Sequence, residues 1–164
     1  MLSPMPLQIR PAASGDVPVI LGFIRGLATY EKLLHEVEAT EDKLAAGLFP
    51  SGGRHPAAEC ILAFLDDHPA GFALFFGTYS TFLAKPGLYL EDIYVEPGFR
   101  GRGIGRALLL HVARLACARD CGRLEWSVLN WNQPAIRFYD SIGARMLPDW
   151  RICRLTGESL SRHA

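Results

Sequence analysis

The chain has 164 residues, of which 49% are hydrophobic, and its 17 basic and 17 acidic residues give a formal net charge of zero. This length favours a single domain with a substantial core. The balanced charge lacks the basic excess that nucleic-acid binding requires, so we expect no nucleic-acid partner. No apolar run approaches the roughly 20 residues of a membrane span, so we expect no membrane partner either.

The N-terminus, the cysteines and the histidines bear on the compartment and on metal binding. Residues 1–6 lack a charged segment followed by a long apolar one, and they predict a flexible lead-in rather than a secretory signal. The four cysteines are irregularly spaced, which favours free thiols over a disulfide framework and predicts a cytoplasmic protein. The histidines show no metal-ligand spacing, so no metal is expected.

The first half of the chain predicts a strand, two helices and a hairpin. Residues 7–10 alternate as a half-buried strand does. Ser14 or Asp16 is expected to cap a first helix, and Thr40 is expected to cap a second one over residues 41–49. Two apolar strands with an Asp-rich connection between them predict a β-hairpin. These strands cover residues 60–65 and 71–78.

The second half is predicted to begin with a loop over 80–87 and a strand over 88–95. A glycine-rich loop leads from that strand into an amphipathic helix that starts near Ile104. Asn132 is placed to cap a later helix, and Gly143 is placed to end it. Further strands are expected at 124–129, 144–146 and 151–155. This order of elements predicts an α+β fold, in which a mixed sheet has helices on both faces.

The glycine-rich loop before Ile104 is the most informative stretch of the chain. Gly101, Gly103 and Gly105 would let a phosphate approach the backbone without meeting a Cβ. The first amides of the following helix lack helical partners, and the helix dipole favours an anion there. Arg100 and Arg102 add fixed positive charge. The loop therefore predicts a phosphate-bearing ligand that is held mainly by the main chain.

Three phosphate-binding patterns compete for this loop. A P-loop requires a Gly-Lys pair, which occurs nowhere in the chain. A dinucleotide fingerprint requires Gly where Arg106 stands, although Glu125 lies about the expected 20 residues further on, so a nucleotide-dependent oxidoreductase stays open as the weaker alternative. The third pattern, Arg-x-x-Gly-x-Gly, is satisfied by Arg100, Gly103 and Gly105.

A second motif follows the next strand. It consists of Asn132, a helix that contains Phe138 and Tyr139, and then Gly143 and Ala144. With the two motifs in this order, the chain resembles the GCN5-related N-acetyltransferase (GNAT) superfamily. The resemblance implies a central mixed, mostly antiparallel sheet that is flanked by helices on both faces. It also implies a single acetyltransferase domain over residues 7–160 that uses acetyl-CoA.

Within this superfamily the chain resembles the spermidine/spermine acetyltransferase-like branch, whose members act on diamines, polyamines and thialysine-type amines. The likeness lies in Thr29–Glu31, Thr78–Ser80, Leu88–Asp92 and Trp131–Asn132. Where the polyamine enzyme has an acidic residue followed by Pro-Trp, this chain has Ser80–Phe82, which favours a shorter diamine, thialysine-like or amino-acid amine over spermine. The branch resemblance further implies a homodimer.

The resemblance and the needs of acetyl transfer suggest roles for single residues. Tyr139 is the candidate general acid for the thiolate, and Glu91 is the candidate base or amine-orienting carboxylate, with Asp92 as a competitor on the other side of the strand. By resemblance alone, the Ile93 amide is a candidate oxyanion donor, and Asn132 would hold the pantetheine arm or a water. The simpler alternatives are core packing for Tyr139, helix capping for Asn132 and a solvated charge for Glu91.

The chain is therefore expected to be an acetyl-CoA-dependent N-acetyltransferase of a small primary amine. Direct transfer is expected, because no Ser or Cys has a recognisable nucleophile setting. The alternatives are a non-catalytic acyl-CoA-binding module and acetylation of a protein amine. The expected cofactor-binding residues are Ile93, Tyr94, Val95, Arg100, Gly101, Arg102, Gly103, Ile104, Gly105, Arg106, Asn132, Ala135 and Phe138. The expected amine-binding residues are Tyr30, Glu31, Tyr79, Glu91, Asp92 and Asp149.

Overall fold

The computed structural model describes residues 7–164, so the lead-in expected at residues 1–6 lies outside the described part. The chain divides into two compact units, of which one reaches to Ser127 and the other runs from Val128 to Ala164. The expectation of a single domain over 7–160 stays a prediction. No helix within the described residues has the length and apolarity to cross a membrane.

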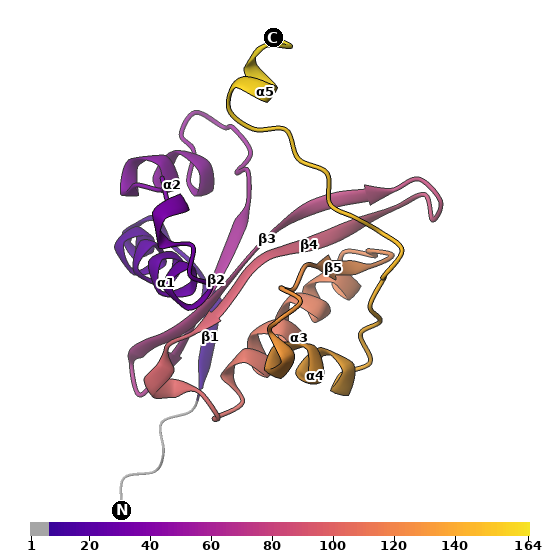
Figure 1. The fold of residues 1–164 in the computed structure, drawn as a ribbon. Coiled ribbons are helices and arrows are strands. Elements are labelled where there is room, and N and C mark those ends of the chain that lie inside the picture. Colours follow the sequence, from indigo (N-terminus) through magenta and orange to yellow (C-terminus); the bar gives the residue numbers. More distant parts are fainter. Residues whose placement is uncertain (1–6) are drawn as a thin grey trace, which may run out of the picture. The chain divides into compact units, whose positions relative to one another are not determined.

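The first unit is built on a five-stranded sheet in which the strands follow their order along the chain (Figure 1). The first three pairings are antiparallel, and the last is parallel. This mixed, mostly antiparallel sheet confirms the predicted fold class. The strands are β1 (Gln8–Pro11), β2 (Glu59–Leu65), β3 (His68–Ser80), β4 (Lys85–Val95) and β5 (Leu124–Trp126).

Helices of the first unit cover both faces of this sheet. Figure 1 shows α1 and α2 on one side of the sheet and α3, which packs on β2, β3 and β4, on the other. On the α1 side Phe23 stacks on Phe72 of β3, with ring centroids 5.6 Å apart. The helices are α1 (Val17–Tyr30), α2 (Glu41–Leu48) and α3 (Ile104–Ala118), and the short 3-10 turns are η1 (Ser14–Asp16), η2 (Leu34–Glu36) and η3 (Pro97–Phe99).

The core on the α1 side brings this helix close to β4. Tyr94 of β4 is buried in a cluster with Phe23 and Phe72. A Cβ added to Gly26 of α1 would lie only 2.5 Å from the Tyr94 hydroxyl. Gly26 therefore provides the space that the tyrosine ring occupies.

The cap of α2 is confirmed, whereas the cap of α1 differs from the prediction. Thr40 accepts a hydrogen bond from the Lys43 amide, as expected of an N-cap. Asp16 stands at the N-cap position of α1 without a side-chain capping bond. Its carboxylate instead accepts from the Arg10 guanidinium at 2.7 and 2.9 Å and from the Ala13 amide. The ion pair with β1 competes for this carboxylate and lowers the pKa of Asp16.

The strands β3 and β4 run further than predicted. Their pairing continues to Ser80 opposite Lys85, which reduces the loop expected over 80–87 to Thr81–Ala84. Ser80 is buried, and its hydroxyl accepts a hydrogen bond from the Leu83 amide at 3.2 Å. Ser80 thus closes the turn, while Phe82 at the tip is fully exposed.

The other predicted strands of the first unit are partly confirmed. The hairpin of β2 and β3 forms as expected, and its turn at Asp66 and Asp67 has φ values of 50° and 60°. Positive φ at two successive positions suits the twist of a tight hairpin. The strand expected over 124–129 ends earlier, because only Leu124–Trp126 pairs with β4.

The second unit contains α4 (Gln133–Ser141) and α5 (Glu158–Ser161). Asn132 caps α4 by accepting a hydrogen bond from the Ala135 amide at 3.4 Å, and Gly143 follows the helix with a φ of 84°, as predicted. The strands predicted at 144–146 and 151–155 are not formed, and Ile152 and Leu155 are exposed. Strand-like composition alone does not make a strand, because the backbone needs a neighbouring strand to pair with.

Candidate active site

The glycine-rich loop between η3 and α3 has an open outer side. Gly101 and Gly103 have φ values of 74° and 78°, in the left-handed region that favours glycine. Among residues 7–164, no heavy atom beyond the glycine and its two chain neighbours lies within 4 Å of the position that a Cβ would take at either residue. At Gly105 the nearest atom is a methyl carbon of Val95, at 3.7 Å. A ligand can therefore approach the main chain here at close range.

The start of α3 supplies the hydrogen-bond donors of this loop. The Ala107 amide makes the bond to the Gly103 carbonyl, at 3.0 Å, that opens the helix. The amides of Ile104, Gly105 and Arg106 precede it, and the N-cap residue, Gly103, has no side chain that could cap them. These donors and the positive end of the helix dipole fit a phosphate group.

One edge of β4 lacks a strand partner next to this loop. β5 pairs with Leu88–Leu90 only, whereas β4 continues to Val95. Within residues 7–164 no other strand of the sheet pairs with that edge of β4. The backbone of residues 91–95 can therefore pair with an extended ligand that carries amide groups.

A β-bulge lies where this open edge begins. Leu74 of β3 is opposite Asp92, and Phe75 is opposite Leu90, so Glu91 is the extra residue of β4. The simple alternation that predicted Glu91 and Asp92 on opposite faces does not continue across this bulge.

The bulge also sets the direction of the backbone amides on the open edge. The Leu88 amide donates towards β5, whereas the Glu96 amide donates towards β3. The amides of even-numbered residues therefore point to β5 before the bulge and to β3 after it. One extra residue in β4 produces this reversal. By the same alternation, the amides of Ile93 and Val95 point to the open edge.

Three carboxylates gather beside the bulge. Burial, and then the charges of Glu91 and Glu31, raise the pKa of Asp92 to about 6. Burial also raises the pKa of Glu31, which is the C-cap of α1. Glu91 is exposed, and Asp92 is partly buried. Carboxylates that repel one another in a partly buried place favour a cation, so this cluster fits an ammonium group.

Arg100 contacts two aromatic rings and a backbone carbonyl of the protein, which the sequence did not indicate. Its guanidinium carbon lies 5.0 Å from the ring centre of Tyr30 and 5.5 Å from that of Tyr94. Its Nε donates to the Val95 carbonyl at 2.8 Å. Arg102 is exposed, as Arg100 is, and lies over the ring of Phe99 at 5.8 Å. No local pattern could have revealed the stacking of Arg100, because Tyr30 is far away in the sequence.

Tyr79 lies apart from the carboxylate cluster. It is exposed and stands opposite Pro86, towards the tip of the β3–β4 hairpin. Leu74, opposite Asp92, lies about 17 Å further along β3 at the usual rise of a strand. The first unit therefore brings Tyr30, Glu31, Glu91 and Asp92 towards one place, but not Tyr79.

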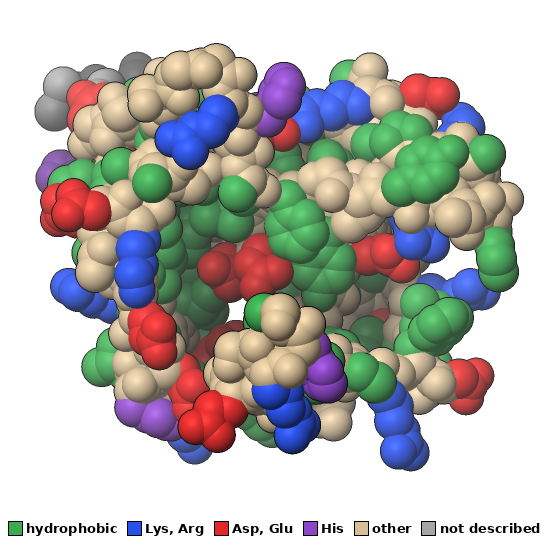
Figure 2. All heavy atoms as spheres, turned by 90° about the horizontal axis from the view of Figure 1, so that it is seen from above, with side chains coloured by type: hydrophobic (Ala, Val, Ile, Leu, Met, Phe, Trp, Pro, Cys, Tyr) green, Lys and Arg blue, Asp and Glu red, His purple; other side chains and the backbone are tan. Residues whose placement is uncertain are grey.

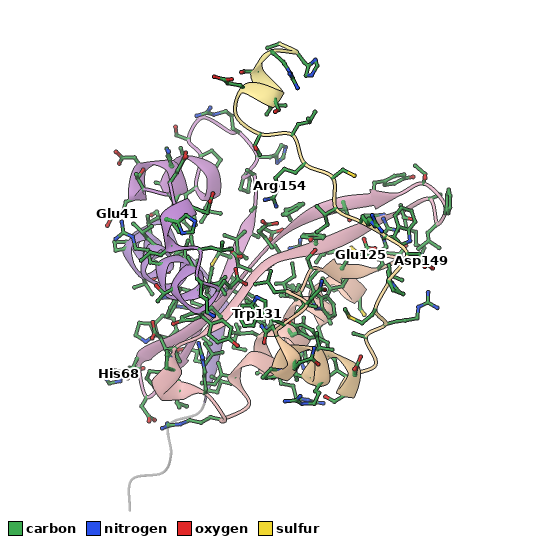
Figure 3. The ribbon with its side chains drawn as sticks, viewed as in Figure 1. Glu41, His68, Glu125, Trp131, Asp149 and Arg154 are labelled. Atoms are coloured by element: carbon green, nitrogen blue, oxygen red, sulfur yellow. The ribbon has the colours of Figure 1, made fainter. Side chains whose placement is uncertain are left out.

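The second unit holds the other predicted site residues. Ala135, Phe138 and Tyr139 lie on α4, and the Tyr139 ring is 5.4 Å from that of Phe138. Tyr139 is buried, whereas Asp149 is exposed. Figure 3 shows Trp131 ahead of α4 and Asp149 on the irregular segment beyond that helix. Their roles stay predictions.

Other titratable groups offer no second centre. In the part of the chain that the structure describes, no cluster of His, Cys, Asp or Glu side chains is arranged to hold a metal. Cys60 is buried, which raises the pKa of its thiol to about 12, while Cys117 is exposed. On the face seen in Figure 2, Lys and Arg side chains lie scattered among acidic ones rather than gathered in one patch.

Comparisons with known proteins agree with this geometry. Residues 19–144 match the model of the Acetyltransferase (GNAT) family. An L-ornithine N5-acetyltransferase from Arabidopsis thaliana is 36% identical over 195 residues, which cover 93% of this chain and 86% of that protein. A thialysine N-epsilon-acetyltransferase from Sus scrofa is 37% identical over 163 residues, which cover 93% of this chain and 94% of that protein. An integron cassette protein from V. cholerae has a similar structure, with a TM-score of 0.77 and 27% identity. The match covers 97% of this chain and 98% of that protein.

Proposed function

Since the chain belongs to the acetyltransferase (GNAT) family, we propose that it transfers an acetyl group from acetyl-CoA to a small primary amine. One observation carries the proposal: an anion site made of main-chain amides and a cluster of three carboxylates are joined by the open edge of β4. The amine is a diamine, polyamine, thialysine-like or amino-acid amine. Two similar proteins are named for L-ornithine and thialysine, which supports this class.

The cofactor site would extend from the loop along β4. The amides of Ile104 to Arg106, with Arg102, would hold the pyrophosphate. The open-edge amides of Ile93 and Val95 would pair with the pantetheine arm or the thioester. Acetyl-CoA supplies the activated acetyl group. Roles in cofactor binding for Asn132, Ala135 and Phe138, which lie in the second unit, remain predictions.

The chemistry requires three events around the thioester. The bound ammonium loses a proton, its nitrogen bonds to the acetyl carbon and releases a second proton, and the carbon–sulfur bond breaks as the sulfur gains a proton. We assign the first event to Glu91, which is exposed at the bulge and would accept the proton directly or through water. The Ile93 amide would stabilise the oxyanion, and Tyr139 would donate its phenol proton to the sulfur.

The carboxylate cluster would bind the amine. The charges of Glu91 and Glu31 lie close enough to Asp92 to help raise its pKa, so the three carboxylates suit a substrate with two cationic groups. Tyr30, next to Glu31, would line the same place. Roles for Tyr79 and Asp149 in amine binding remain predictions.

We further propose a cytoplasmic homodimer that has no nucleic-acid partner. The likeness to the spermidine/spermine branch supports the dimer, and the four free cysteines support a reducing compartment. Light scattering should give a species of twice the 18.1 kDa chain mass, and a single species of the chain mass would contradict the dimer.

The activity is tested by thiol release from acetyl-CoA across a panel of amines. The panel holds ornithine, lysine, thialysine, diaminopropane, putrescine, spermidine, spermine and an aminoglycoside. We expect rapid release with one class, and slower release for Tyr139→Phe and Glu91→Gln at unchanged acetyl-CoA affinity. Saturable acetyl-CoA binding without release would instead favour a non-catalytic module or a protein amine. Binding of NAD in place of acetyl-CoA would favour the oxidoreductase.

A further inference from the structure

Arg100 connects three parts of the first unit. Its guanidinium faces the ring of Tyr30 at the end of α1 and the ring of Tyr94 on β4, and its Nε is bonded to the carbonyl of Val95 at the end of that strand. A planar guanidinium suits such stacking together with a fixed hydrogen bond. The side chain is therefore held by two aromatic rings and one backbone carbonyl.

Both rings beneath Arg100 adjoin the carboxylate cluster. Tyr30 is the last residue of α1 and directly precedes Glu31. Tyr94 follows Asp92 by two positions and lies on the same side of β4, since their partners Phe72 and Leu74 alternate on β3. Each stacked ring is thus tied through the backbone to one carboxylate of the amine site.

We propose that Arg100 is a positioning residue of the amine site rather than a ligand of the cofactor phosphates. It holds the C-terminal end of α1 against β4, so that Glu31 stays beside Asp92. Phosphate binding is left to the amides at the start of α3 and to Arg102 and Arg106, for which no contact with Tyr30 or Tyr94 is seen among residues 7–164. This inference rests on the proposed function, because it assigns the cluster to the amine.

The electrostatics of Tyr94 agree with this placement. Burial and the charge of Glu96 raise the pKa of the Tyr94 phenol, and the Arg100 guanidinium acts in the opposite direction. The cation therefore lies close enough to the phenol to offset part of the burial. A side chain extended towards a phosphate on the outer side of the loop would not do so.

The test compares Arg100→Met with Arg102→Met, which removes the same charge two positions further along the loop. For Arg100→Met we expect the KM of the amine to rise about tenfold, while kcat and the calorimetric Kd of acetyl-CoA change less than about threefold. For Arg102→Met we expect the acetyl-CoA Kd to rise and the amine KM to remain unchanged. If Arg100→Met weakens acetyl-CoA as much as Arg102→Met does, the inference is wrong.

A double-mutant cycle shows whether Arg100 acts through Tyr30. We expect the amine KM of the double variant Arg100→Met/Tyr30→Leu to be no higher than that of the more affected single variant. Arg100→Lys, which keeps a cation over the rings, should recover part of the lost affinity. Effects that multiply in the double variant would show that the two side chains act independently.

Two further measurements keep the outcome clear. Thermal unfolding reports whether each variant is folded, and Arg100→Lys replaces Arg100→Met if the latter fails to fold, with the same expected split between amine KM and acetyl-CoA Kd. If the unmodified protein acetylates no amine, the proposed function fails. The positioning role of Arg100 is then tested by acetyl-CoA affinity alone. If Arg100→Met and Arg102→Met lose acetyl-CoA affinity equally, that role is still contradicted.

Discussion

The phosphate loop and the carboxylate cluster lie at the two ends of the same stretch of β4, but they are built in different ways. The loop is made of consecutive residues, and its proposed ligand-binding groups are backbone amides at a helix start. The cluster is made of side chains that arrive from α1 and from a bulge in β4. A site of local backbone geometry can be predicted from sequence, whereas a site of distant side chains requires the fold.

The comparison implies that the two sites can be damaged separately. Substitutions in the loop should change acetyl-CoA affinity, and substitutions in the cluster should change amine affinity. A variant that lowers acetyl-CoA affinity and amine affinity equally would show that the loop and the cluster form one site.

The largest effect is expected for Gly103→Glu. The new side chain would need a φ of 78° and would place negative charge where the phosphate binds, so acetyl-CoA affinity should fall by roughly 100-fold or more. Calorimetry measures this loss. Gly98→Glu in η3 is the matched control, because it adds the same charge to the same connection at a residue without positive φ. An equal loss in both variants would contradict the site.

The next effect is expected for Asp92→Asn. Removing one charge from a partly buried ion-pair site should lower kcat/KM for the amine by about 30-fold, while the acetyl-CoA Kd stays unchanged. Glu125→Gln is the control, because Glu125 (labelled in Figure 3) is a carboxylate on β5 that pairs with Arg123. Asp92→Asn kinetics that match those of the control would show that Asp92 does not bind the amine.

Gly26→Ala tests the packing beneath the amine site. The new methyl group would collide with the ring of Tyr94, so the free energy of unfolding should fall by about 1–2 kcal/mol, and the amine KM should rise. Gly22→Ala on the same helix meets no atom within 4 Å and should instead stabilise the protein by up to about 1 kcal/mol. Urea unfolding of both variants measures the difference, and a stabilised Gly26→Ala protein would be the contrary result.

The raised pKa of Asp92 predicts a pH dependence of stability. Because its folded pKa is about 6, above the ordinary value, the folded state holds a proton that the unfolded state releases between about pH 4 and pH 6. The free energy of unfolding should therefore fall as pH rises through this window. Since the carboxyl is only partly buried, we expect a change on the order of 1 kcal/mol. Urea unfolding across the window should show a flatter profile for Asp92→Asn, and identical profiles would contradict the shift.

The smallest effect is expected for Gly105→Ala, which separates stability from binding. A Cβ at this helical position meets only ordinary contact with Val95, so the variant should gain up to about 1 kcal/mol of stability. Its methyl group would nevertheless stand where the phosphate approaches, so acetyl-CoA affinity should fall several-fold. Gly47→Ala in α2 should raise stability without changing affinity, and unaltered affinity in Gly105→Ala would indicate that the ligand does not contact Gly105.

Signals confined to neighbouring residues predicted much of the fold. The caps Thr40 and Asn132, the β2–β3 hairpin and the start of α3 near Ile104 are all confirmed, because each depends on a few consecutive residues. Gly101 and Gly103 have positive φ, while the phosphate site that the spacing of the loop glycines predicts stays a prediction.

Features that depend on a distant neighbour could not be predicted. Nothing in the sequence around Glu91 shows the bulge, since its position is set by the register with β3. The stacking of Arg100 on Tyr30 requires contact between α1 and the loop. The strands expected at 144–146 and 151–155 failed for the same reason, because their composition gives no information about a pairing partner.

The central claim is that the two sites are occupied together and that the acetyl group moves directly between their ligands. Initial rates measured while acetyl-CoA and thialysine are varied together test this claim most directly. Double-reciprocal lines that intersect are the predicted result, because both ligands must be bound before transfer. Parallel lines, which indicate an acyl-enzyme and successive use of one site, would contradict the account.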